Sequence, residues 1–182
     1  MEEGFDESEL KSVVESALAI NGLSEHGYIK EFTDLACSMS NYFVSSRKSM
    51  EKATISPITL ELGGEKVIVR PDDILSEPSG RKVVRRIRTG HARKKDDSVG
   101  TAAFILASEQ AYPSAKVETL YLADELTSES SLTAKVLSNR KKTLIDIITQ
   151  IRLGQFPAKR SSRSCPSCPA FFYLRYGSVG LK

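Results

Sequence analysis

Residues 69–90 read VRPDDILSEPSGRKVVRRIRTG, and this segment decides the fold that the sequence predicts. It begins with an acidic pair after a proline, Pro71-Asp72-Asp73. A serine-glycine turn then leads into an apolar strand over residues 82–87, and this strand ends in arginines. Because residues two apart on a strand point to the same face, Arg86 and Arg88 are predicted to lie side by side.

The elements around this segment follow from periodicity. Apolar residues at helical spacing predict helices, and alternating apolar residues predict strands. Gly63-Gly64 is expected to turn a hairpin, and Pro113 is expected to stop a helix. The predicted helices cover residues 6–22, about 24 through 43, 99–112 and 132–153, and the predicted strands cover 58–62, 66–69, 82–87 and 117–122.

This order of elements predicts an α/β fold in a single domain over residues 1–182. Three antiparallel strands, a crossover helix and a fourth strand give a mixed sheet flanked by helices. The last helix carries an apolar stripe that is expected to face the core, formed by Leu144, Ile147, Ile148 and Ile151.

Composition narrows the class of protein. The chain is 40% hydrophobic and 27% charged, as expected of a globular domain. No apolar run reaches the length of a membrane span, and the first residues are acidic, unlike the basic start of a signal peptide. A cytoplasmic location without membrane contact is therefore expected. Three cysteines form no even disulfide framework, which argues against a stapled secreted scaffold.

Positive charge is concentrated in the middle of the chain, although the net charge is only +3. No acid interrupts the segment from residue 81 to residue 95. Such asymmetry favours a polyanionic partner, and the alternative is an ordinary solvated surface. The basic residues of this segment are Arg81, Lys82, Arg85, Arg86, Arg88, Arg93, Lys94 and Lys95.

Four motifs carry a resemblance to a known family. They are Val69 to Ile74, Arg85 to Gly90, the stretch from Tyr112 to Leu122, and Ile151 to Pro157 with Cys165-Pro166-Ser167-Cys168-Pro169 after it. In these motifs the chain resembles the RecB-type nuclease domain of the PD-(D/E)XK superfamily. That domain occurs at the C-terminus of UvrD-like DNA helicases and in helicase-nucleases of double-strand break repair. The resemblance covers residues 23–174, which leaves the helix within 1–22 as an addition.

The resemblance implies a restriction-endonuclease-like fold, yet the motif that would hold the metal has changed. An active member has an acid at the position of Arg86, a lysine at that of Arg88 and a histidine at that of Glu31. A guanidinium has no acceptor and cannot ligate a cation, so Asp72 and Asp73 are interpreted as remnants of a catalytic site. The resemblance thus implies a DNA-binding pseudonuclease in helicase-linked repair or recombination, with a superfamily 1 helicase motor as a candidate partner.

Two other functions stay open. The first is an active, magnesium-dependent nuclease whose missing acid has moved to Glu65 or Glu118. The second is a structural module that docks on another protein. In that case Arg86 and Arg88 protect a strand edge from aggregation, and the two aspartates after Pro71 only make a turn.

The cysteines and His91 are the remaining candidate site residues. Iron-sulfur members of the family join an upstream cysteine to a C-terminal cysteine cluster. Here Cys165 and Cys168 have that spacing, Cys37 is the upstream candidate, and Leu174 replaces the last ligand. The cysteines predict an iron-sulfur cluster, a zinc site completed by His26 or a partner chain, or a metal-free turn. His91, at the end of the third strand, is expected to contact phosphate or solvent.

Overall fold

The computed structural model describes residues 6–92 and 96–155. The chain divides into two compact units, residues 1–145 and residues 146–182. The first unit holds the described strands and most of the described helical residues. Of the second unit the structure describes residues 146–155, most of which form the last turns of one helix. The C-terminal segment with Cys165 and Cys168 lies outside the described residues.

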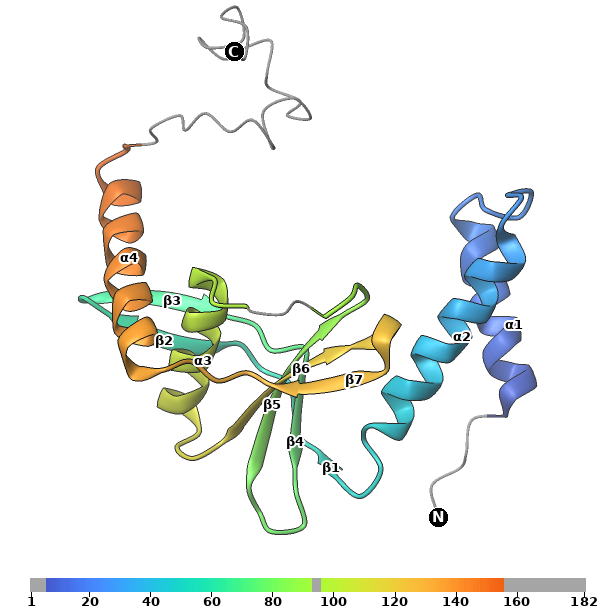
Figure 1. Cartoon of the computed structure of the whole chain (residues 1–182), viewed down its shortest axis with the longest axis horizontal. Helices are drawn as coiled ribbons and strands as arrows, with labels where there is room; N and C mark the ends of the chain where they lie inside the picture. Colours follow the sequence, from blue (N-terminus) through green and yellow to red (C-terminus); the bar gives the residue numbers. More distant parts are fainter. Residues whose placement is uncertain (1–5, 93–95, 156–182) are drawn as a thin grey trace, which may run out of the picture. The chain divides into compact units, whose positions relative to one another are not determined.

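A mixed five-stranded sheet forms the centre of the first unit, which confirms the predicted α/β class (Figure 1). Its order is β1-β4-β5-β6-β7. Only β5 and β6 are parallel, and helix α3 (Val99–Ala111) makes the crossover between them. The strands are β1 (Glu51–Lys52), β4 (Asp73–Ser76), β5 (Lys82–Arg88), β6 (Lys116–Tyr121) and β7 (Leu126–Glu129).

The predicted hairpin exists but does not belong to this sheet. Strands β2 (Ile58–Leu62) and β3 (Glu65–Val69) form a separate two-stranded sheet, so the expectation of one sheet containing the hairpin is wrong. The place beside β5 is taken by β4, which pairs Asp73 with Arg85. Strand β4 was not predicted, because three of its four residues are buried and no alternation marks it.

Helix α3 lies between the two sheets and makes the centre of the core. Phe104 and Ile105 pack with Val84 of β5 and Val117 of β6, and the opposite side of the helix contacts β2 (Figure 1). The Ser98 hydroxyl caps the helix by accepting a hydrogen bond from the Thr101 amide at 3.2 Å. This helix therefore fixes one face of the five-stranded sheet.

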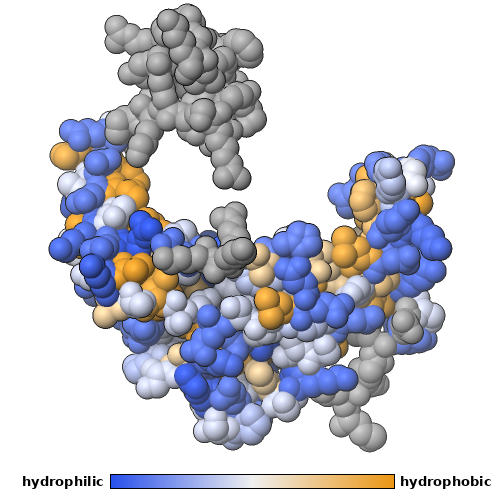
Figure 2. Space-filling model, viewed as in Figure 1, coloured by the Kyte–Doolittle hydropathy of each residue, from blue (hydrophilic) through white to orange (hydrophobic). Residues whose placement is uncertain are grey.

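Helices α1 (Glu7–Ile20) and α2 (Ile29–Ser45) precede the sheet as predicted. Helix α2 begins later than residue 24, because residues 21–28 form turns instead. Two hydrogen bonds join α2 to the β7 edge of the sheet. Ser38 donates to Glu125 at 2.5 Å, and the hydroxyls of Tyr42 and Thr127 lie 2.9 Å apart. Apolar side chains remain on the surface of these helices (Figure 2), and they include Val13, Ile20, Phe32, Leu35 and Val44.

Helix α4 (Ala134–Arg152) ends two residues before the predicted Gly154. None of its residues is fully buried; along the predicted stripe Leu144 and Ile148 are half-buried, and Ile147 and Ile151 are exposed. The stripe extends past residue 145, where the first unit ends. Within the described ranges, no helix has the length and apolar character needed to cross a membrane.

Candidate functional site

Strand β5 presents arginines to both faces of the sheet. Arg86 and Arg88 point toward the side of α3, where the Arg86 guanidinium carbon lies 5.1 Å from the centre of the Phe104 ring. Arg85 points to the opposite face and is only 2% exposed. Arg86 and Arg88 share a face, as predicted, because side chains two apart on a strand point the same way. Arg85, one residue before Arg86, points to the other face for the same reason.

Arg85 belongs to a set of buried charges on the face away from α3. Its Nε donates a 2.7 Å hydrogen bond to Glu118, and its Nη1 donates to the Ser46 carbonyl at 3.1 Å. Asp73 and Glu118 flank Arg85 in register on β4 and β6. We call this set the buried charge row; its members are Arg47, Asp73, Arg85, Lys116 and Glu118.

The row holds three cations and two carboxylates, and each carboxylate pairs with at least one cation. Burial opposes ionisation of Glu118, but hydrogen bonds from Lys116 and Arg85 outweigh it and hold the Glu118 pKa below its ordinary value. The same hydrogen bond raises the pKa of Lys116. Removing one member would leave an uncompensated buried charge, which is why the row has a structural role.

The structure gives the two candidate catalytic aspartates different surroundings. Asp73 is 2% exposed and accepts a 2.8 Å hydrogen bond from Arg47 Nε. Asp72 is exposed in the bend before β4, and its Oδ2 accepts a 2.8 Å hydrogen bond from the Ile87 amide. The pairing of Asp73 with Arg85 places Asp72 next to Arg86 on the adjoining strand. Asp73 is thus committed to the buried charge row, and Asp72 borders the arginines of the α3 side.

A second group of charges lies where β5 ends, and we call it the open basic site: Asp72, Arg86, Arg88 and Asp96. Arg88 Nη2 lies 3.6 Å from Asp96 Oδ2, and among the described residues the buried Arg88 Nε has no hydrogen-bond partner. Partial burial and the neighbouring Arg88 lower the pKa of Arg86, while Asp96, Asp72 and Tyr121 act in the opposite direction. The exposed part of the Arg88 guanidinium, beside Arg86, is suited to an anion, since a guanidinium binds phosphate oxygens in pairs.

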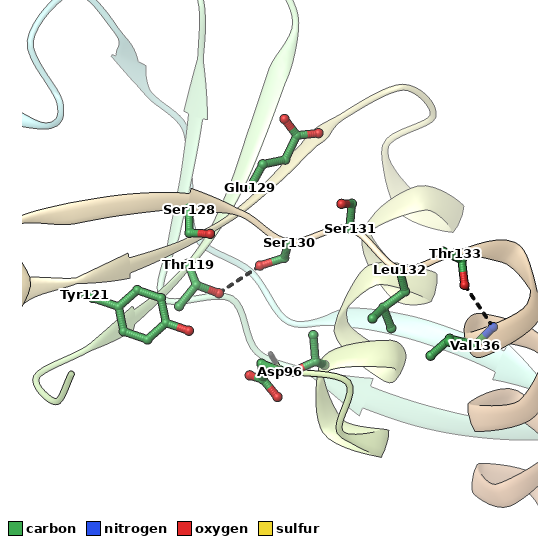
Figure 3. A pocket seen from close by; sticks show the side chains of 11 residues that line it. Asp96, Thr119, Tyr121, Ser128, Glu129, Ser130, Ser131, Leu132, Thr133 and Val136 are labelled. Carbon is green, nitrogen blue, oxygen red and sulfur yellow. Dashed lines mark hydrogen bonds between the residues drawn. The ribbon is translucent and has the colours of Figure 1, made fainter. Parts of the chain in front are cut away.

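Two cavities meet at this site. One, of about 450 Å³, is lined by the end of β5 from Ile87 through His91 together with Asp96 and Tyr121. The other, of about 390 Å³, continues from Asp96 and Tyr121 along β7 and the segment after it (Figure 3). His91 Nδ1 lies 2.6 Å from Asp124 Oδ1, which holds the loop that borders the first cavity. Hydrogen bonding from His91 and Ala92 lowers the pKa of Asp124.

Only part of the predicted basic surface converges on the open basic site. Arg81 Nε donates to the Ser114 carbonyl at 3.0 Å, and Lys82 Nζ donates to Ser76 at 2.7 Å. Arg85 is internal, as described above. The last three basic residues, Arg93, Lys94 and Lys95, lie outside the described residues. Asp96, Tyr121 and Asp124 were not predicted as site residues, although Tyr121 lies in one of the four motifs, because they come from separate elements that meet only in the fold.

The predicted metal sites are not assembled in the part of the chain that the structure describes. There, no group of three or more His, Cys, Asp or Glu side chains could hold a metal ion. Cys37 is a half-buried free thiol on α2. Of the two acids considered as relocated ligands, Glu118 is held in the buried charge row and Glu65 begins β3 in the other sheet.

Comparison with known proteins adds no relative. No family model matches the chain, and no curated protein matches it. The function must therefore be argued from the open basic site and the fold.

Proposed function

We propose that this chain is a DNA-binding domain with a restriction-endonuclease-like fold of the RecB type, which holds the DNA backbone without cutting it. The observation that carries the proposal is the open basic site. Arg86 and Arg88 lie beside Asp72 at the end of β5, where the resemblance expects an acid and a lysine around a metal. Two guanidinium groups oppose a divalent cation and favour a phosphate.

Three further features support this proposal. The mixed sheet with a parallel β5–α3–β6 unit is compatible with a nuclease-like fold. The Arg88 side chain is 41% exposed, so its guanidinium can reach a phosphate oxygen. The other acid of the Pro71-Asp72-Asp73 motif, Asp73, is committed to Arg47. A helicase motor as partner, a role in repair or recombination, and a metal at Cys37, Cys165 and Cys168 remain predictions from the resemblance.

The binding test is a titration of labelled DNA at several salt concentrations. Replacing Arg86 and Arg88 together by alanine should weaken binding and reduce the salt slope by about 2, since each arginine that contacts a phosphate contributes about 1. A matched control replaces Lys11 and Lys30 by alanine. These lysines lie on α1 and α2, and their replacement removes the same amount of positive charge. Equal effects of the two double variants, or no DNA binding at low salt, would leave protein docking as the better explanation.

The cleavage test uses magnesium or manganese with linear and single-stranded DNA. We expect intact DNA, because the described residues offer no acid cluster for the metal. Metal-dependent degradation that is lost in Asp72→Ala would show an active nuclease instead. Replacing Arg86 by aspartate and Arg88 by lysine restores the charge pattern of an active member, and any cleavage gained would show that the remaining geometry of the site is sound.

A further inference from the structure

We propose that the cavity beside the open basic site binds the ribose of one ribonucleotide whose phosphate lies on Arg86 and Arg88. This inference uses the same two arginines as the proposed function and adds a ligand of stated chemistry. It rests on two neighbouring cavities that share Asp96 and Tyr121 but differ in their charge. The first cavity is lined by Arg88, and we call the second the hydroxyl pocket.

The hydroxyl pocket is lined by groups that recognise alcohols. Seven of its eleven lining residues are serine, threonine or tyrosine, and its charged residues are Asp96 and Glu129. Figure 3 shows Tyr121, Thr119 and Ser130 on one side of this space and Asp96 across from them, with Thr119 and Ser130 joined by a 2.8 Å hydrogen bond. No lysine or arginine lines it, so the pocket repels a phosphate and accepts hydrogen-bond donors.

The arginines that would hold the phosphate and the hydroxyl pocket that would hold the ribose lie close enough for one nucleotide to reach both. Asp96 pairs with Arg88 and also lines the hydroxyl pocket, so an anion on the arginines stands directly beside acceptors for hydroxyl groups. A carboxylate that accepts from the 2′-hydroxyl is a recurring way to recognise ribose, and the 2′-hydroxyl distinguishes RNA from DNA. Asp96 is the acceptor that we assign to this contact, because Glu129 pairs in register with Glu118 and so points to the opposite face of the sheet.

The size of the hydroxyl pocket fits a single unit. Its volume of about 390 Å³ is near the lower end of the range for small ligands, roughly 300 to 1,000 Å³. A paired base inside a duplex cannot enter such a space. The ligand is therefore either a free ribonucleoside monophosphate or an unpaired ribonucleotide at the end of a strand, and both present the same phosphate and ribose.

The test compares ligands that differ by one hydroxyl. Calorimetric titration of the full chain with AMP and with 2′-deoxy-AMP should show about tenfold tighter binding of AMP, because the pocket is built to pair with that hydroxyl. Two oligonucleotides of one sequence, which differ only in a terminal ribonucleotide, separate the two sources. Discrimination with AMP alone identifies a free ribonucleotide, and discrimination with both identifies a strand end as well.

Two single variants test whether AMP binds in the hydroxyl pocket. Ser128 is exposed on β7 and lines the pocket, so Ser128→Leu should fill it and abolish AMP binding. Ser138→Leu makes the same change on α4 away from the pocket and should leave AMP binding intact. Equal binding of AMP and 2′-deoxy-AMP, or AMP binding that survives Ser128→Leu, would overturn the inference.

The outcomes also separate this inference from the proposed function. DNA binding that depends on Arg86 and Arg88, with no preference for the 2′-hydroxyl, would refute the hydroxyl pocket alone. Binding of AMP that is lost in Ser128→Leu, in a protein that does not bind DNA, would refute the proposed DNA-binding function alone.

Discussion

The buried charge row and the open basic site use arginines of the same strand in opposite ways. Arg85 is enclosed and its charge is matched by Glu118, whereas the Arg88 side chain is 41% exposed and lies 3.6 Å from Asp96. They differ because successive side chains of β5 point to opposite faces, one covered by the end of α2 and the other open beside α3. A run of arginines is therefore not one surface, and only the arginines on the open face are available to a ligand.

Replacing Arg85 should cause the largest loss of folding stability. Arg85→Met should lower the free energy of unfolding by about 3 kcal/mol, because the buried Glu118 would lose one of its two cationic partners and keep only Lys116. The measurement is urea unfolding of the full chain. Arg86→Met is the matched control on the open face and should cost about 1 kcal/mol or less, mainly through loss of the contact with Phe104. Equal losses in the two variants would show that the faces do not differ.

A smaller effect should separate the two aspartates. Asp73→Asn weakens a charged hydrogen bond to Arg47 in a buried setting, for which we expect a loss of about 1.5–3 kcal/mol. Asp72→Asn keeps an oxygen that can accept from the Ile87 amide, so its cost should be about 1 kcal/mol or less. Thermal unfolding of both variants gives the comparison. A larger loss at Asp72 would mean that the exposed aspartate, not the buried one, supports the fold.

The smallest effect concerns the dependence of stability on pH. The Glu118 pKa is lowered in the folded state, so its ionised form stabilises the fold above the unfolded value of about 4.3. This contribution is lost as the pH falls below that value through the folded pKa. Glu118→Gln should therefore flatten the decline of stability between neutral and acid pH. Glu109→Gln, on the exposed side of α3, should retain the decline, and a decline unchanged in Glu118→Gln would contradict the argument.

Local patterns predicted much of the fold. The alternation in Ile58 to Leu62 and the turn at Gly63-Gly64, where both glycines have positive φ, specified the hairpin. Strand β7 was missed because its sequence, LTSE, is mostly polar and exposed. The sheet to which each strand belongs was not predictable, because pairing depends on contacts between distant segments.

The candidate site was predictable only where it is local. The shared face of Arg86 and Arg88 follows from their spacing, whereas Asp96, Tyr121 and the hydroxyl pocket arise where separate elements meet. The burial of Arg85 was equally hidden, because nothing in its own segment shows that Ser46 and Glu118 lie against it.

The hydrogen bonds of α2 have a consequence for synthesis of the chain on the ribosome. Tyr42 of α2 is joined to Thr127 of β7, 85 residues later. At roughly 5 to 20 residues per second, the helix waits on the order of 4 to 17 seconds before its docking strand has been made. Ser38 and Tyr42 lack their partners near β7 during that interval, so α2 docks on the sheet only after β7 has been made.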